Sequence, residues 1–238
     1  MSRKPVALSW SGGKDSVLAL HALRNSVDYE VTALITSVTK GYDRISMHGD
    51  RRSLLERQAD ALGLPLVEVT LEPASSDAAY QAAFLRGLAE LGRLQPQVAH
   101  IVFGDLYLAD VRAYRDRRLA SIAFRGLYPL WKQPTSALAE RFISAGFVAT
   151  LVCTDNTQID PSFAGRSFDR VLVADLPPTA DPCGENGEFH TFVSDGPVFR
   201  RPVALMKGET ITRDGRFTYC DLLEIETPAS LQPCDYGL

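Results

Sequence analysis

The sequence has no segment that resembles a membrane span or a secretion signal. Its 238 residues include no apolar run close to the roughly 18 residues that a spanning helix requires. The first five residues lead directly into a strand-like segment, without the apolar stretch and cleavage site of a signal peptide. The four cysteines, at positions 153, 183, 220 and 234, form neither a C-x-x-C pair nor a zinc-ligand spacing, which favours reduced thiols. We therefore expect a cytoplasmic protein that does not bind a membrane.

An excess of charge of one sign is also missing. The chain has 25 Lys and Arg against 29 Asp and Glu, a formal net charge of −4, so no global attraction to nucleic acid is expected. Low-complexity segments and internal repeats are absent as well, and 45% of the residues are hydrophobic, which argues against disorder. The length allows one large domain or two modest ones.

The first half of the chain alternates apolar, β-branched segments with helical patterns, which predicts a parallel sheet built from β-α-β units. Ser53 and Glu56 have the spacing of a capping box with Ser53 as the N-cap, and Gly63 is expected to end the same helix. The predicted strands lie near residues 6–10, 29–36, 64–70 and 100–103, and the predicted helices near residues 15–23, 53–62, 77–91 and 109–124.

The pattern changes near residue 130. Pro129 and Pro134 bracket a bulky aromatic segment where a helix cannot continue, which indicates a linker. We predict an α/β domain over residues 1–130 and a smaller α+β domain over residues 131–238. The second domain is expected to contain a helix near residues 135–145, strands near residues 147–153, 203–212 and 217–226, and a Gly/Pro/Asp-rich stretch between them.

The strongest motif is Ser11-Gly12-Gly13-Lys14-Asp15-Ser16, which follows the first predicted strand. The glycines let the backbone turn and present N–H groups to an anion, and the helix that begins here adds its positive end. Such a loop suits phosphate, with Lys14 as the cation, Ser11 and Ser16 as hydroxyl donors and Asp15 as a magnesium ligand. On physics alone, Asp15 is equally well explained as an acid in the first turn of a helix. The spacing is neither that of a Walker loop nor that of a dinucleotide fold.

The loop resembles the pyrophosphate loop of the N-type ATP pyrophosphatases. Residues 181–192, D-P-C-G-E-N-G-E-F-H-T-F, resemble the C-terminal signature C-G-E-G-G-E-Y/F-E-T-F of the diphthine-ammonia ligase family, which belongs to the same superfamily. Asn186 and His190 depart from that signature, where the family has Gly and Glu. Further agreement comes from residues 102–105, 110–112, 129–131 and 162–166, so the resemblance covers nearly the whole chain.

The resemblance implies an adenine nucleotide α-hydrolase-like, Rossmann-like ATP domain, with the C-terminal domain closing over its nucleotide site. It implies that the enzyme uses ATP and Mg²⁺ to adenylate a carboxylate acceptor, releases pyrophosphate, and forms an amide with free ammonia. Because His190 replaces an anionic residue, we expect the acceptor to differ from the cationic diphthine. The residues carried over are Lys14, Asp15, Glu185 and Glu188 for catalysis; Ser11, Gly12, Gly13, Lys14, Asp15, Ser16, His48, Gly104, Asp105 and Arg112 for the nucleotide; and Asn186, Gly187, His190 and Thr191 for the acceptor.

Several of these residues have simpler explanations. Glu185 and Glu188 could converge on one amine or metal ion, or they could be solvated acids of a glycine-rich loop. Asp105 could cap a helix, and His48 could be a loop histidine without a role. Cys183 is more often structural than a nucleophile in such a setting.

Two other functions stay open. Whether the protein forms a homodimer also stays open. A helix rich in arginine, at positions 112, 115, 117, 118 and 125, is the best support for a tRNA-modifying, thiolase-like enzyme, although a solvated helix face explains it more simply. The other alternative is a non-catalytic module that binds ATP or AMP.

Overall fold

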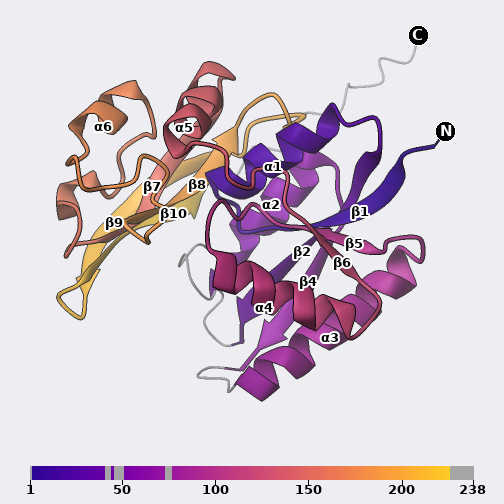
Figure 1. Cartoon of the computed structure of the whole chain (residues 1–238). Helices are drawn as coiled ribbons and strands as arrows, with labels where there is room; N and C mark the ends of the chain where they lie inside the picture. The colour runs from indigo at the N-terminus through magenta and orange to yellow at the C-terminus, as the bar shows by residue number, and fades with distance from the viewer. Residues whose placement is uncertain (1, 41–43, 46–50, 73–76, 226–238) are drawn as a thin grey trace, which may run out of the picture.

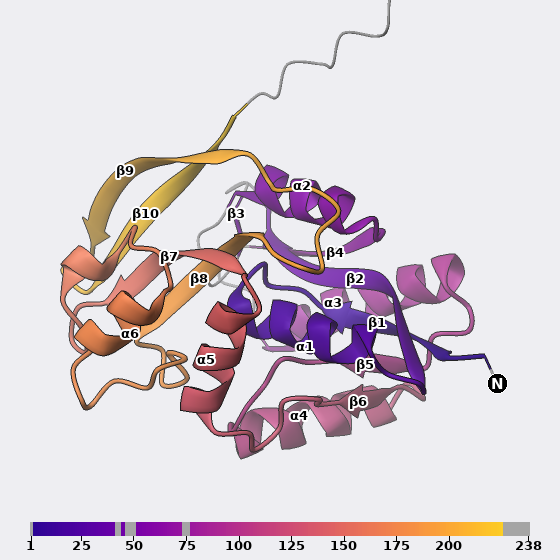
Figure 2. The same ribbon diagram turned by 90° about the horizontal axis from the view of Figure 1, so that it is seen from above.

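The computed structural model describes residues 2–40, 44–45, 51–72 and 77–225 (Figure 1). His48 lies outside these residues. Two sheets make up the framework: a mainly parallel sheet from the first half of the chain and an antiparallel sheet from the second half (Figures 1 and 2). Within the described residues, no helix is both long and apolar enough to cross a membrane.

The first sheet confirms the predicted α/β class. Five strands run parallel in the order β4-β2-β1-β5-β6, and the short β3 (Arg44–Ile45) pairs antiparallel with the end of β2. Such an order, which reverses beside the first strand, is Rossmann-like and places ligand sites at the carboxyl ends of the strands. The parallel strands are β1 (Lys4–Ser9), β2 (Tyr29–Thr39), β4 (Leu66–Leu71), β5 (His100–Val102) and β6 (Arg125–Leu127).

Helices cover both faces of this sheet. Val6 and Leu8 of β1 pack with α1 (Lys14–Arg24) and α2 (Arg52–Leu62) in one hydrophobic cluster. Ala7, which points to the opposite face, packs with α3 (Asp77–Leu94) and α4 (Ala109–Ala120) in another. Alternation along a single strand therefore assigns the helices to their layers.

The second sheet has the antiparallel order β8-β7-β10-β9. Helix α5 (Thr135–Ser144) leads into it, and a short 3₁₀ helix (Pro161–Phe163) and α6 (Arg170–Asp175) lie between its first two strands in the chain. Its strands are β7 (Val148–Asp155), β8 (Phe189–Asp195), β9 (Leu205–Arg213) and β10 (Phe217–Glu224).

The hydrophobic core is continuous between the two halves of the chain. Phe142 of α5 and Val193 of β8 belong to the same cluster as Leu18 of α1. The boundary near residue 130 therefore stays a prediction, because side chains from both sides of it share one core.

Three local expectations from the sequence are wrong. Helix α4 ends at Ala120 rather than Phe124, because Ala123 adopts a left-handed φ of 61° that no helix continues, and the unexpected strand β6 follows it. Helix α2 begins at Arg52, so Ser53 is not its N-cap. The third error lies between the strands expected near residues 147–153 and 203–212, where the sequence predicts no strand and β8 spans Phe189–Asp195. Gly63 does end α2, with a left-handed φ of 69°.

Candidate active site

The glycine loop between β1 and α1 is held in shape by residues distant in sequence. The N–H of Val193 on β8 donates to the carbonyl oxygen of Gly12 over 2.9 Å. The buried amide of Gln58 donates to the carbonyl oxygens of Gly12 (3.0 Å) and Val193 (2.6 Å), and its own oxygen accepts from the Trp10 indole (2.9 Å). Gly12 has a φ of 79°, which favours glycine. The loop is thus a three-element assembly of β1, α2 and β8.

Two of the predicted glycines are required by close backbone approach. A Cβ on Gly13 would lie 2.9 Å from the carbonyl oxygen of Thr191, and a Cβ on Gly104 would lie 2.7 Å from the carbonyl carbon of Asp15. Both distances are too short for any side chain. The end of β5 and strand β8 therefore press directly against the start of α1.

Lys14 is a buried ammonium at the centre of this contact. Its Nζ lies 2.8 Å from Oδ2 of Asp15, and its backbone N–H donates to Oγ1 of Thr191 over 3.1 Å, which joins residues 177 positions apart. Burial lowers the pKa of Lys14, but the charge of Asp15 and other neighbours outweighs burial, so the pKa is raised above its usual value. Lys14 is therefore a permanent cation in a largely dry site.

The loop hydroxyls also contact the loop itself. Oγ of Ser11 accepts the N–H of Gly13 over 3.3 Å, and Oγ of Ser16 donates to the carbonyl oxygen of Gly13 over 2.8 Å. These bonds fix the turn that precedes α1.

Three carboxylates from different elements act on one another around Lys14. Burial raises the pKa of Asp105, which follows β5, against the opposing effect of its ion pair with Arg115; Asp15 raises it further. Burial and then Asp15 likewise raise the pKa of Glu185, whose Oε1 accepts the N–H of Tyr107 over 3.2 Å. Asp15, Asp105 and Glu185 therefore form an acidic rim around the buried ammonium of Lys14.

Asp15 and Asp105 suit a Mg²⁺ ion whose remaining ligands are phosphate oxygens and water. In the described part of the chain, no three His, Cys, Asp or Glu side chains are grouped to hold a metal ion. Mg²⁺ usually takes one or two carboxylates and completes its shell with water and substrate phosphates. Asp15 and Asp105 offer the hard oxygen ligands that such a site needs.

Glu188 has different surroundings from Glu185. It is 1% exposed, and its carboxylate accepts the N–H of Asp181 (2.7 Å), the N–H of Asn186 (2.9 Å) and the side-chain amide of Asn186 (3.0 Å). Glu188 thus faces into its own loop, whereas Glu185 faces Tyr107. The sequence spacing brings the two glutamates near each other without giving them a common partner.

Cys183 is buried beneath the loop formed by residues 181–188. Its Sγ donates to the carbonyl oxygen of Thr135 over 3.2 Å. Burial is the main reason that the pKa of the thiol is raised to about 12. At neutral pH the side chain is therefore a thiol and not a nucleophilic thiolate.

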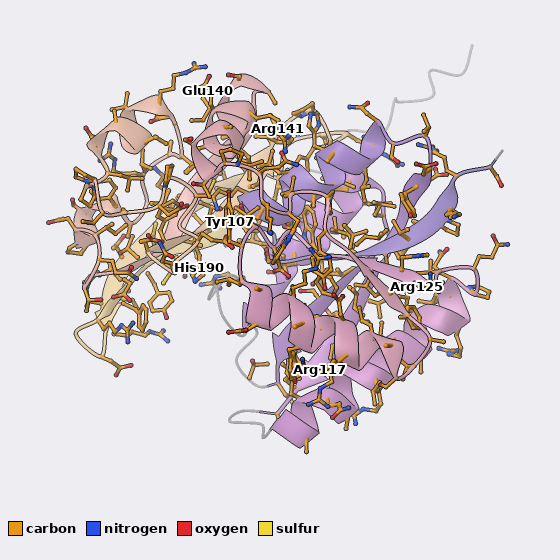
Figure 3. All side chains as sticks on the ribbon, viewed as in Figure 1. Tyr107, Arg117, Arg125, Glu140, Arg141 and His190 are labelled. Carbon is orange, nitrogen blue, oxygen red and sulfur yellow. The ribbon has the colours of Figure 1, made fainter. Side chains whose placement is uncertain are left out.

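The residues assigned to the acceptor lie at the start of β8 and just before it. Burial lowers the pKa of His190, and the positive charge of Lys14 lowers it further, so the imidazole is neutral at pH 7. Figure 3 labels His190 and Tyr107 where the second sheet faces the first. Gly187 has a φ of 83°, and Thr191 is buried against Lys14.

A cavity of about 250 Å³ opens beside the glycine loop, at the carboxyl ends of β1, β2 and β4. Its walls are largely apolar, and Arg115 and Arg118 of α4 are the cationic residues among them. The predicted Arg112 is not among its lining residues: its guanidinium lies between the rings of Tyr128 and Trp131, 4.5 and 4.6 Å from their centroids. The residues that line the cavity are Ser9, Trp10, Ser11, Ile35, Thr36, Ser37, Leu71, Tyr80, Gln81, Phe84, Leu85, Phe103, Tyr114, Arg115, Arg118 and Leu119.

Comparison with known families identifies both halves of the chain. The model of the diphthamide synthase N-terminal domain matches residues 4–124, and that of the diphthamide synthase C-terminal domain matches residues 134–224. The chain belongs to the diphthamide synthase family. The predicted resemblance to the diphthine-ammonia ligase family is thereby confirmed.

Curated relatives in this family are distant and carry one name, diphthine–ammonia ligase. The protein of Bos taurus is 24% identical over 262 aligned positions, covering 96% of this chain and 94% of its own. The protein of Danio rerio is 27% identical over 167 positions, covering 64% of this chain and 65% of its own. That of Schizosaccharomyces pombe is 24% identical, and the match spans 84% of this chain but only 36% of the relative.

Sequence reasoning missed Gln58, Tyr107 and Arg115 as parts of the site. Gln58 carries a usable signal, since it is a polar residue on the apolar side of a helix between Leu55 and Leu62. Tyr107 and Arg115 carry no such signal, because they reach the site only through the way in which α4 and the loop before it pack.

Proposed function

We propose that this protein is an ATP-dependent ligase of the N-type ATP pyrophosphatase class, which activates a carboxylate as an acyl-adenylate and converts it to an amide with ammonia. The observation that carries the proposal is the junction of the glycine loop with β8, where buried Lys14 lies among carboxylates beside a nucleotide-sized cavity. The names of the distant relatives give the reaction class.

The nucleotide is proposed to place its nucleoside in the cavity and its phosphates over Ser11 to Ser16. Lys14 Nζ then exchanges its contact with Asp15 for phosphate oxygens, which frees the Asp15 carboxylate. Asp15 and Asp105 would hold Mg²⁺, which when bound neutralises charge on the departing pyrophosphate. Gly104 belongs to this site because it lets β5 approach Asp15.

In the first step, an acceptor carboxylate oxygen attacks the α-phosphorus, and the bond from that phosphorus to the oxygen bridging to the β-phosphate breaks. In the second, the ammonia nitrogen attacks the acyl carbon, AMP leaves with the acyl oxygen electrons, and the nitrogen loses a proton. Glu185 is suited to hold that proton, because its raised pKa lies closer to neutrality than that of an ordinary glutamate.

Acceptor recognition is assigned to the start of β8 and the preceding loop. Asn186, Gly187, His190 and Thr191 surround the acyl site in this proposal, and buried Glu188 keeps Asn186 in position. Because His190 is neutral, it offers no anionic partner to a trimethylammonium group, and we propose an acceptor other than diphthine.

The test is product formation with Lys14→Met as the matched variant. Wild-type protein with Mg-ATP, ammonium and a metabolite extract should give AMP and pyrophosphate, while Lys14→Met should lose at least a hundredfold in rate because phosphate charge is no longer neutralised. Circular dichroism and thermal melting would check that the variant is folded.

The same experiment separates the alternatives. ATP binding without AMP formation under any acceptor mixture would indicate a non-catalytic nucleotide module and would contradict the ligase proposal. Equal turnover by Lys14→Met would remove the glycine loop from the mechanism. A thiolase-like reaction has less support, because burial keeps the Cys183 thiol protonated.

A further inference from the structure

A second cavity lies at the carboxyl ends of α1 and α2, away from the glycine loop. It has a volume of about 330 Å³, and its apolar lining includes the buried side chains of Leu20, Leu23 and Leu62. Helix α1 begins at Lys14 in the glycine loop and ends at Arg24, which lines this cavity. The helix is roughly 15 Å long, so the cavity is distinct from the proposed nucleotide site.

Cations outnumber acids in this second cavity. The charged residues among its described lining are Arg3, Arg24, Arg200 and Glu30. Glu30 pairs with Arg3 over 3.1 Å, which leaves two arginines. Within the part of the chain that the structure describes, neither Arg24 nor Arg200 has an ion pair with a carboxylate. Nη2 of Arg24 donates to the carbonyl oxygen of Val198 over 2.6 Å, which is a neutral partner.

Packing keeps the guanidinium groups of Arg24 and Arg200 close enough to act on each other. That of Arg200 lies directly against Gly63, so a Cβ on this glycine would overlap with it. Partial burial lowers the pKa of Arg24, and the positive charge of Arg200 lowers it further, because the two cations repel. The carboxyl ends of α1 and α2 favour cations, but their partial charges do not neutralise two guanidinium groups. An anion between the two arginines would remove the repulsion.

We propose that this cavity binds a small organic phosphate, with its phosphate group between Arg24 and Arg200 and its organic part against the leucine side chains. Guanidinium groups bind phosphate through paired, charge-assisted hydrogen bonds. The volume lies within the range of small-molecule sites, and the apolar lining suits a ligand larger than an inorganic ion. This site goes beyond the ligase activity and does not rest on it.

Phenyl phosphate is a direct probe of this site, because it joins a phosphate group to a small apolar ring. Titration calorimetry with the full chain should show saturable binding of phenyl phosphate, weaker binding of inorganic phosphate and no binding of phenol. Lys14→Met removes the cation of the glycine loop and should keep a site with a Kd within about twofold of the wild type, since Lys14 lies at the other end of α1.

Substitution of the arginines in the Lys14→Met protein, where the glycine loop adds no second phosphate site, locates the binding. Arg24→Gln and Arg200→Gln should each raise the Kd for phenyl phosphate about tenfold or more, because each removes one charged partner. The matched control is Arg201→Gln, for which the Kd should stay within about twofold. Arg201 is exposed, pairs with Asp60 and is not among the residues that line the cavity.

Three results would overturn the proposal. The first is a folded wild-type protein that binds no phenyl phosphate. The second is loss of binding in folded Lys14→Met, which would place the phosphate in the glycine loop. The third is a Kd that neither Arg24→Gln nor Arg200→Gln raises more than Arg201→Gln does. Melting temperatures would check that each variant is folded, and AMP formation tests the ligase proposal separately.

Discussion

The chemistry available to a single residue here depends on what buries it. Cys183 and Lys14 lie in the same site, and burial disfavours the charged form of both side chains. Their charge states at neutral pH nevertheless differ. Burial keeps the thiol protonated, whereas the acidic neighbours of Lys14 keep the amine charged despite burial. The site therefore combines a permanent cation with an inert sulfur.

The inertness of Cys183 can be tested directly. Cys183→Ala should retain AMP formation within about threefold, because no thiolate takes part, while stability falls by about 1 kcal/mol through the lost volume and hydrogen bond. Turnover assays and urea unfolding would measure both quantities. A well-folded variant that makes no AMP would revive a thiol mechanism.

At the scale of elements, α2 has a role that its sequence only hints at. Gln58 connects α2 to the glycine loop and to β8 through three hydrogen bonds. The helix thereby positions the site without contributing a group to it.

Replacing Gln58 by Leu should be costly for both stability and nucleotide binding. The change leaves the Trp10 N–H and the carbonyl oxygens of Gly12 and Val193 without this partner, at a cost of about 2–4 kcal/mol in the free energy of unfolding. Urea unfolding would measure the loss, with exposed Glu56→Ala on the same helix as control, for which less than about 0.5 kcal/mol is expected. A Gln58→Leu protein as stable as the control would contradict this role.

The sequence predicts the elements whose signals are local. The parallel strands β1, β2 and β4 and the helices α1 and α3 appear near their predicted positions, since periodicity and the glycine signals act within each segment. Strand β6 has only three residues, and β8 begins directly after a glycine-rich loop, so neither has a local pattern of its own.

The candidate site likewise contains residues with a local sequence signal and residues without one. The glycine loop is recognisable from its composition, whereas the position of Arg112 against Tyr128 and Trp131, rather than at the cavity, depends on the packing of α4. Sequence spacing cannot separate Arg112 from Arg115, because both lie within one turn of a helix whose orientation is set by tertiary contacts.

For the whole molecule, the histidines link stability to pH. Burial is the main reason that the pKa values of His21, His100 and His190 are all lowered in the folded protein. The unfolded chain therefore binds more protons below pH 6.5, so stability present above that pH is lost as the pH falls. The raised pKa values of Asp105 and Glu185 act in the opposite direction.

Substitution of His190 tests how much one histidine contributes to the pH dependence of stability. His190→Gln removes one group that must become charged, so the free energy of unfolding should fall less steeply between pH 7.5 and about pH 5 than in the wild type. Urea unfolding at several pH values would give the slopes, and an unchanged slope would show that His190 does not contribute. Exposed Arg117, which Figure 3 labels on α4 away from His190, offers a control as Arg117→Gln.

The bond from Val193 to Gly12 also bears on how the protein is made. Translation proceeds from the N-terminus, so the glycine loop leaves the ribosome long before β8 has been synthesised. Until then Gly12 and Lys14 lack their hydrogen-bond partners on β8. We therefore expect the glycine loop to reach its final shape only after β8 has been synthesised and has paired with it.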